Sequence, residues 1–163
     1  MRVVVRISQM LALAGVAALL GLALLTTADV IGRLFGRPIP GFMDIATLAT
    51  AVIVPSFFPI LLVRRANITL RPFAYFGPRG PARILDAFGS LLTAAFMVLM
   101  AWQYVRYAAE AASSGERMAV LRWSVAPWWW AVAALVAIAA VVALAMWVED
   151  LQRVRDPDRT EGG

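Results

Sequence analysis

Cysteine, histidine and lysine are all missing from this chain of 163 residues. Without cysteine there can be no disulfide, no thiol nucleophile and no thiolate ligand for a metal. Without histidine there is no bis-imidazole haem, which excludes a four-helix cytochrome b, and the usual general base and zinc ligand are absent too. No nucleotide-binding loop or nucleophile elbow is present either, so we expect neither enzyme activity nor a cofactor.

Charge is also scarce. Only 15% of the residues are charged, whereas 62% are hydrophobic, and a soluble domain is typically nearer half apolar. The charges cluster between long apolar runs, as expected in a membrane protein, because a charge at mid-bilayer costs roughly 2.5–3.5 kcal/mol. The net charge of +5 is better explained by loops lying against anionic lipid than by nucleic acid, which we do not expect as a partner.

Four apolar runs are present, and each is close to the ~20 residues that cross a bilayer as a helix. A barrel strand needs only ~10, so helix is favoured. We predict an all-α integral membrane protein with a single domain over residues 1–155 and a disordered polar tail over 156–163. The first run also allows a signal peptide, but it is long for one and lacks a good cleavage site. The predicted helices cover about residues 10–30, 43–63, 84–108 and 126–150.

The arginines predict the orientation, because short cytoplasmic loops are enriched in basic residues. Four helices place both termini and the central loop on one side, and that side carries ten arginines against five on the other. We therefore expect a multi-pass protein of the bacterial inner membrane with both termini in the cytoplasm. The richer side holds Arg2, Arg6, Arg64, Arg65, Arg71, Arg79, Arg83, Arg153, Arg155 and Arg159.

The loops differ in kind. Residues 33–42 combine two glycines with two prolines, which predicts a tight, stiff turn. The basic loop between helices two and three contains Leu70–Phe76, where apolar groups flank Arg71, and we expect a short interfacial segment there. Residues 108–125 begin as an extension of helix three that ends near Ser114. Aromatic residues typical of the headgroup level mark the helix ends: Trp102, Tyr104, Tyr107, Trp123, Trp128, Trp129, Trp130 and Trp147.

Three charged residues near helix ends are candidates for a functional role. Asp29 and Arg33 are four apart and can pair along helix one. Asp44 opens helix two, where a carboxylate suits the positive end of the helix dipole. Either aspartate could serve as an ion or proton site. None lies at mid-membrane, however, so ordinary helix-end charges at the interface are favoured.

Helix two contains Pro55 and Pro59, each of which removes a backbone donor. Such a break can expose carbonyls to a solute in a transporter, but no acidic or amide side chain lies nearby, and a kink that shapes packing is the favoured interpretation. Arg64 and Arg65 follow this helix, where they either bind lipid phosphates or a partner, or simply determine topology.

Small residues recur at helical spacing in helices one and four. Such residues let membrane helices approach closely, either within the chain or across a subunit interface. Alanine-rich sequences also produce this pattern by chance. The positions are Ala14, Ala18 and Gly21 in helix one, and Ala133, Ala137 and Ala140 in helix four.

Several short motifs follow one another along the chain. They are Asp29-Val30-Ile31-Gly32-Arg33, Arg37-Pro38-Ile39-Pro40-Gly41, Arg64-Arg65-Ala66-Asn67-Ile68-Thr69, Trp102-Gln103-Tyr104, Ser114-Gly115-Glu116-Arg117 and Ala126-Pro127-Trp128-Trp129. In this order they resemble the small permease subunit (DctQ-like, Q-type) of TRAP transporters, the tripartite ATP-independent periplasmic transporters, and the resemblance covers roughly residues 10–150. Two departures are the single Asp44 where the family often has an acidic pair, and Asn67 where it often has histidine.

The resemblance implies a scaffold or accessory role. In this family the small subunit packs against a large permease subunit that contains the transport site. A periplasmic binding protein delivers the solute, usually an organic acid, and an ion gradient, typically sodium, drives symport. The part of the predicted helices within the hydrocarbon core contains almost no ionisable residue, which agrees with such a role. The alternative is a stand-alone, homo-oligomeric transporter or channel, which would need mid-membrane polar groups that the chain lacks.

Overall fold

The computed structural model describes residues 2–64 and 79–155, and within them the chain is helical apart from its connections. The helices are α1 (Arg2–Leu34), α2 (Phe42–Ser56), α3 (Phe58–Val63), α5 (Arg79–Ser114) and α6 (Ala126–Arg155). Together α2 and α3 form one span, so four helical segments are long and apolar enough to cross a membrane. The predicted all-α membrane fold is thus confirmed. Arg65, the expected interfacial segment 70–76 and the tail 156–163 lie outside the described residues.

The first and third spans are longer than predicted. Helix α1 has 33 residues and α5 has 36, which correspond to about 50 Å and 54 Å at ~1.5 Å per residue, against a hydrocarbon core of ~30 Å. The predicted spans included only the apolar stretch of each, whereas the extension predicted after helix three, ending near Ser114, agrees with the end of α5. A helix does not have to end where the hydrocarbon ends, because its hydrogen bonds are internal and polar side chains such as Arg6 and Glu110 are solvated outside the core.

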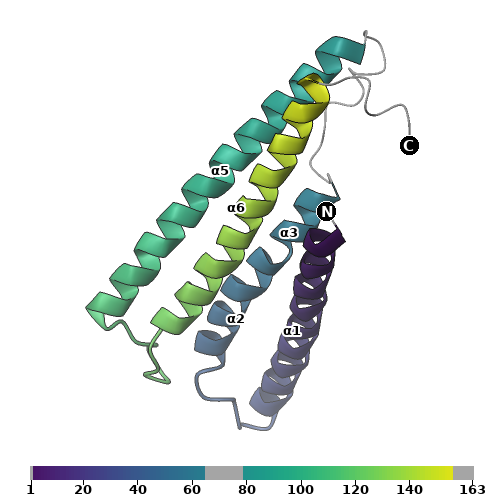
Figure 1. Ribbon diagram of the computed structural model, residues 1–163. Coiled ribbons are helices and arrows are strands. Elements are labelled where there is room, and N and C mark those ends of the chain that lie inside the picture. Colours follow the sequence, from purple (N-terminus) through teal and green to yellow (C-terminus); the bar gives the residue numbers. More distant parts are fainter. Residues whose placement is uncertain (1, 65–78, 156–163) are drawn as a thin grey trace.

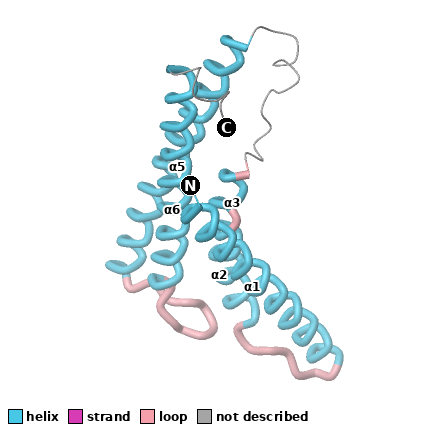
Figure 2. The backbone as a smooth tube through the Cα atoms, turned by 45° about the vertical axis from the view of Figure 1, so that its right-hand side comes forward, coloured by secondary structure: helices cyan, strands magenta, loops and turns pink. Residues whose placement is uncertain are grey.

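The helices lie in a row, α1, then α2 with α3, then α6, then α5, and they do not close into a symmetric bundle (Figure 1). Helix α6 packs along α5 on one side and against α2 and α3 on the other, while α1 packs only on α2 and α3 to any extent. Figure 2 shows the α1–α2 pair inclined to the α5–α6 pair. The α1–α2 and α5–α6 connections lie at one end of the molecule, here named the turn end, and the opposite end is named the terminal end.

Two clusters of buried side chains hold the row together. One lies between α3, α5 and α6 and is rich in alanine, with Ala94, Ala139 and Ala143 at most 3% exposed. Small side chains let α5 and α6 approach closely. Of the small positions predicted on α6, Ala133 and Ala140 are buried outside this cluster, and Ala137 is partly buried. The other cluster, at the turn end, is built on Leu48, Ala111, Met118 and Val125.

The buried face of α1 follows a seven-residue repeat. Ser8, Gly15 and Asp29 are buried, and Leu22 completes the series as a partly buried residue. This spacing keeps one seam of a helix against its neighbour, as in left-handed coiled coils. Outside the seam α1 is exposed: only 6% of its most apolar window is buried within the chain, against 39% for the α2–α3 and α6 windows.

Aromatic contacts at the turn end fix α5 against the start of α6. The Trp129 ring meets Tyr107 edge-on with ring centroids 4.6 Å apart and is stacked with Tyr104 at 6.3 Å. The Arg106 guanidinium lies 5.0 Å from the centre of the Trp102 ring. These residues include members of the predicted aromatic belt, and their mutual contacts show that the helix-three and helix-four parts of the belt lie at one level.

Candidate functional site

A buried carboxylate with two hydrogen-bond partners lies at the turn end, where α1 ends and the connection to α2 begins. Asp29 is 1% exposed. Its Oδ2 accepts a hydrogen bond from Arg33 Nε at 2.7 Å, and its Oδ1 accepts one from the Ile39 backbone N–H at 2.9 Å. The pair between Asp29 and Arg33 that the sequence allowed is therefore present. The carboxylate also holds the returning chain ten residues on, which the sequence did not suggest.

The same connection contains a close backbone approach. The Arg37 N–H donates to the Gly32 carbonyl at 2.7 Å, and a Cβ placed on Gly32 would lie 2.5 Å from the Arg37 carbonyl oxygen. Any side chain at position 32 would thus push the turn open. The Asp29 carboxylate and the bare backbone of Gly32 hold the connection closed, in agreement with the tight, stiff turn that we predicted.

A second carboxylate links distant parts of the chain. Asp44 lies in the first turn of α2, and its Oδ2 accepts hydrogen bonds from the backbone N–H groups of Val120 and Leu121 at 2.8 Å and 3.2 Å. The sequence suggested a helix-dipole role for Asp44, and its place in the first turn of α2 allows that role. The sequence did not suggest this contact with a loop 76 residues away. Gly41 (φ 74°) lies under that loop, because a Cβ there would meet Leu121 Cγ at 2.6 Å.

Residues 116–125 form what we name the turn-end hairpin. Met118 N–H donates to the Trp123 carbonyl at 2.9 Å and Val125 N–H to the Glu116 carbonyl at 3.2 Å, with an antiparallel bridge between Arg117 and Ser124. A turn of this kind gives no strong signal in the sequence. The hairpin connects α5 to α6, and Asp44 bonds its tip to α2. The α5–α6 pair is therefore joined to α2 at the turn end.

The two prolines of the second span divide it where the sequence indicated. Helix α2 ends at Ser56 and α3 begins at Phe58, because Pro55 and Pro59 cannot donate backbone hydrogen bonds. The Ser56 hydroxyl donates to the Ile53 carbonyl at 2.6 Å. Both prolines and Ser56 are buried. The break therefore lies inside the helix row and faces the neighbouring helices.

The residue that brings α1 close to this break is Gly15, which the sequence analysis missed. A Cβ on Gly15 would overlap Ser56 Oγ and would lie 3.1 Å from Phe57 Cζ. The predicted small residues Ala14, Ala18 and Gly21 are exposed instead, and their contact with a partner helix stays a prediction. The signal that could have identified Gly15 is its seven-residue spacing from Ser8 and Asp29.

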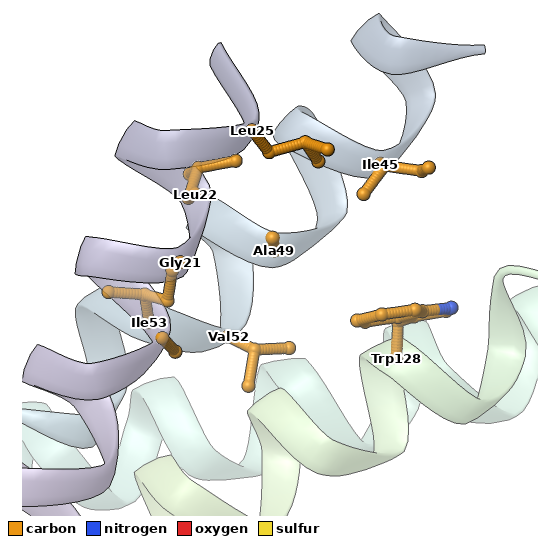
Figure 3. Close-up of a pocket in the computed structure, with 9 residues that line it drawn as sticks. Gly21, Leu22, Leu25, Ile45, Ala49, Val52, Ile53 and Trp128 are labelled. Atoms are coloured by element: carbon orange, nitrogen blue, oxygen red, sulfur yellow. The ribbon is translucent and has the colours of Figure 1, made fainter. Parts of the chain in front are cut away.

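Beside the exposed small residues is an open cavity of about 230 Å³ between α1, α2 and the first turn of α6. Figure 3 shows Leu22, Leu25 and Ile45 on one side of it and Trp128 across from Val52 and Ala49. All of its lining residues are apolar: Ala18, Gly21, Leu22, Leu25, Ile45, Ala49, Val52, Ile53 and Trp128. Such a cavity offers no ligand to an ion or a charged solute.

The remaining predicted positions lie at the terminal end or outside the described chain. Arg64 follows α3 as its exposed C-terminal cap, and Arg65 is not among the described residues. Over residues 2–64 and 79–155 no three Asp or Glu side chains come together as a metal-binding group. Ser8 is fully buried on α1, and its hydroxyl has no hydrogen-bond partner within the described part of the chain.

Comparison with known proteins gives the chain its family. The model of the family described as "Tripartite ATP-independent periplasmic transporters, DctQ component" matches residues 22–153, which include the C-terminal part of α1 and nearly all of the other three spans. Searches of curated proteins and of solved structures found no match. The family match agrees with the four-span architecture and with the resemblance drawn from the sequence motifs. The chain belongs to the DctQ component family of tripartite ATP-independent periplasmic transporters, as a small membrane subunit of such a transporter.

Proposed function

We propose that this chain is a scaffold subunit that supports a large permease subunit in ion-gradient-driven uptake of an organic acid delivered by a periplasmic binding protein. The family match supports the transporter. The observation that supports a scaffold role, with the solute pathway in the large subunit, is that no polar cavity is described in this chain. The one cavity described above has only apolar walls, and the buried carboxylate of Asp29 is already occupied by Arg33 and a backbone N–H.

The exposed surface of α1 supports the interface expected with the large subunit. Ala14, Ala18 and Gly21 are exposed, and a Cβ on Gly21 would meet nothing within 4 Å. Small exposed residues on a membrane helix let a second helix approach to van der Waals contact, where packing provides most of the association energy. We therefore place part of the interface with the permease on this face of α1.

The proposed orientation puts the terminal end in the cytoplasm. The ends of α1, α3 and α6 that carry Arg6, Arg64 and Arg155 lie toward that end in Figure 1, together with the start of α5. The turn end would then face the periplasm, where the binding protein arrives. Single cysteines in this natural cysteine-free chain allow a direct test, since a membrane-impermeant thiol reagent should label position 114 and not position 6 in intact cells.

The function is tested by isolating the tagged chain from native membranes in mild detergent and identifying what comes with it. Recovery of a large multi-spanning protein in equal amount, together with loss of solute uptake when this chain is deleted, is the expected result. Recovery of this chain only, as a homo-oligomer that conducts solute in liposomes, would establish the stand-alone transporter instead.

Two variants test the interface without disturbing the fold. Ala14→Leu with Ala18→Leu adds bulk to the exposed face of α1 and should reduce the recovered permease. Ala95→Leu makes the same change at an exposed position of α5 and is the matched control for added bulk on a lipid-facing helix. Equal recovery of the permease with both variants would move the interface away from this face of α1.

A further inference from the structure

The turn-end hairpin has two different faces. Met118 and Val125 are 6% and 7% exposed and pack with Leu121 into the cluster at this end of the row. On the other face Val120 and Trp123 are 60% and 61% exposed. Arg117 and Arg122 are exposed as well. A connection that only returned the chain to α6 would not need an exposed aromatic ring next to an exposed arginine.

The hairpin is also held in one shape. Its two backbone hydrogen bonds close it, and Asp44 fixes its tip through two more. Arg122 adopts a left-handed conformation with φ 56°, which is uncommon for a residue other than glycine and costs free energy. The loop therefore holds the backbone of Arg122 at one place, from which the exposed guanidinium can reach a ligand.

Its height along the helices follows from the aromatic contacts. Tyr107 of α5 meets Trp129 of α6, and rings of this kind favour the boundary between hydrocarbon and headgroups. Trp123 precedes the first residue of α6, Ala126, by only three positions. On α5, Arg106 lies over the Trp102 ring at the same level. Two arginine–tryptophan pairs, Arg106 with Trp102 and Arg122 with its sequence neighbour Trp123, thus lie near the headgroup level at the turn end.

We propose that the turn-end hairpin is a lipid-binding element that holds phospholipid headgroups of the leaflet at this end. The Trp123 ring and the Val120 side chain lie against the glycerol and upper acyl region, and Arg117 and Arg122 bind the phosphates, for which the planar guanidinium is well suited. The hairpin contains these two arginines and one acidic residue, Glu116, so its net charge is positive and favours anions. This inference needs only that the chain crosses the membrane, and it is independent of the transported solute.

The occupant is a lipid surface rather than a soluble protein because apolar and aromatic exposure coincides with the level of the belt. Contact with lipid removes Val120 and Trp123 from water, and no segment of a partner protein has to become ordered for this contact. A soluble protein binding at the turn end would then have to use the α1–α2 connection, and the hairpin would determine how close that protein comes to the bilayer.

The test is a depth measurement with a single spin label on the full chain in liposomes. The cysteine-free sequence allows Val120→Cys and Arg37→Cys, both exposed. Arg37 is the control, since it lies on the α1–α2 connection at the same end of the molecule. We expect the label at 120 to be shielded from a water-soluble nickel complex and accessible to oxygen, and the label at 37 to show the reverse. Equal nickel accessibility at both positions would overturn the proposal.

The charge component is tested with Arg117→Gln and Arg122→Asn, the second chosen because asparagine tolerates the left-handed conformation. Each arginine near an anionic surface contributes about a fivefold preference. Contact of spin-labelled phosphatidylglycerol, relative to phosphatidylcholine, should therefore fall in each variant and further in the double variant. An unchanged lipid preference in the double variant, or a label at 120 that is shielded only after a soluble protein is added, would refute lipid binding and favour protein docking.

Discussion

Replacing Gly15 with alanine should loosen α1 from the break in the second span. The new methyl would overlap Ser56 Oγ and lie 3.1 Å from Phe57 Cζ and 3.3 Å from Ser56 Cβ. The serine can rotate only by giving up its 2.6 Å hydrogen bond to the Ile53 carbonyl. Otherwise α1 has to move away from the divided helix. Both responses are costly in a buried seam.

The magnitude follows from three terms. Alanine is favoured over glycine in a helix by about 1 kcal/mol. Overpacking costs about 1–3 kcal/mol, and loss of the Ser56 hydrogen bond about 1 kcal/mol. Gly21→Ala is the matched control, because a Cβ there meets nothing within 4 Å and the helix term alone applies. Because either the serine rotates or α1 moves, the two alanine variants should differ by about 1–3 kcal/mol in the free energy of unfolding.

The assay is reversible unfolding by SDS in mixed micelles, followed by circular dichroism. Ser56→Ala provides the second half of a double-mutant cycle, because it removes the overlapping oxygen. We expect it to restore part of the stability lost in Gly15→Ala, with a coupling energy of about 1–2 kcal/mol. If Gly15→Ala is as stable as Gly21→Ala, or if Ser56→Ala gives no rescue, the close packing argued for this seam is wrong.

Substitutions at three further positions test single polar groups by the same unfolding assay. Asp44→Ala should cost about 1–3 kcal/mol, because the N–H groups of Val120 and Leu121 lose their acceptor, whereas Asp44→Asn keeps an acceptor oxygen and should cost less; equal effects would argue against these two bonds. Asp29→Ala should cost about 2–4 kcal/mol, since it removes the partner of a guanidinium and of a backbone N–H at once, and a neutral result would contradict the role assigned to this turn. Ser8→Ala should leave stability unchanged or raise it by up to about 1 kcal/mol, because the buried hydroxyl has no partner within the described residues; a clear loss of stability would reveal a hydrogen bond that the structure lacks.

The local features of this protein could be predicted from its sequence. Four apolar runs predict four spanning helices because every backbone polar group in lipid has to be satisfied within the helix. The division of the second span at Pro55 and Pro59 also follows from local chemistry, since each proline lacks a donor. The pairing of Asp29 with Arg33 follows in the same way from their spacing on a helix. The order of short motifs predicted the family, which the match over residues 22–153 then confirmed.

The faces of the helices could not be predicted, and the physical reason is the solvent. In water a helix shows its buried side by its apolar stripe, but in lipid the buried and exposed sides are both apolar, so the pattern is nearly uniform. Gly15 and Gly21 look alike in the sequence, yet one is buried against Ser56 and the other is open. Only the tertiary structure distinguishes them.

The long-range polar contacts were equally out of reach of the sequence. Asp44 meets Val120 and Leu121 across 76 and 77 residues, and nothing in the residues around either partner indicates the other. The hairpin that receives this carboxylate takes its shape from backbone hydrogen bonds and from an arginine in a left-handed conformation. The sequence by itself determined which segments enter the membrane and where they bend. Folding in three dimensions decided which faces meet, because packing and hydrogen bonding depend on neighbours that are distant along the chain.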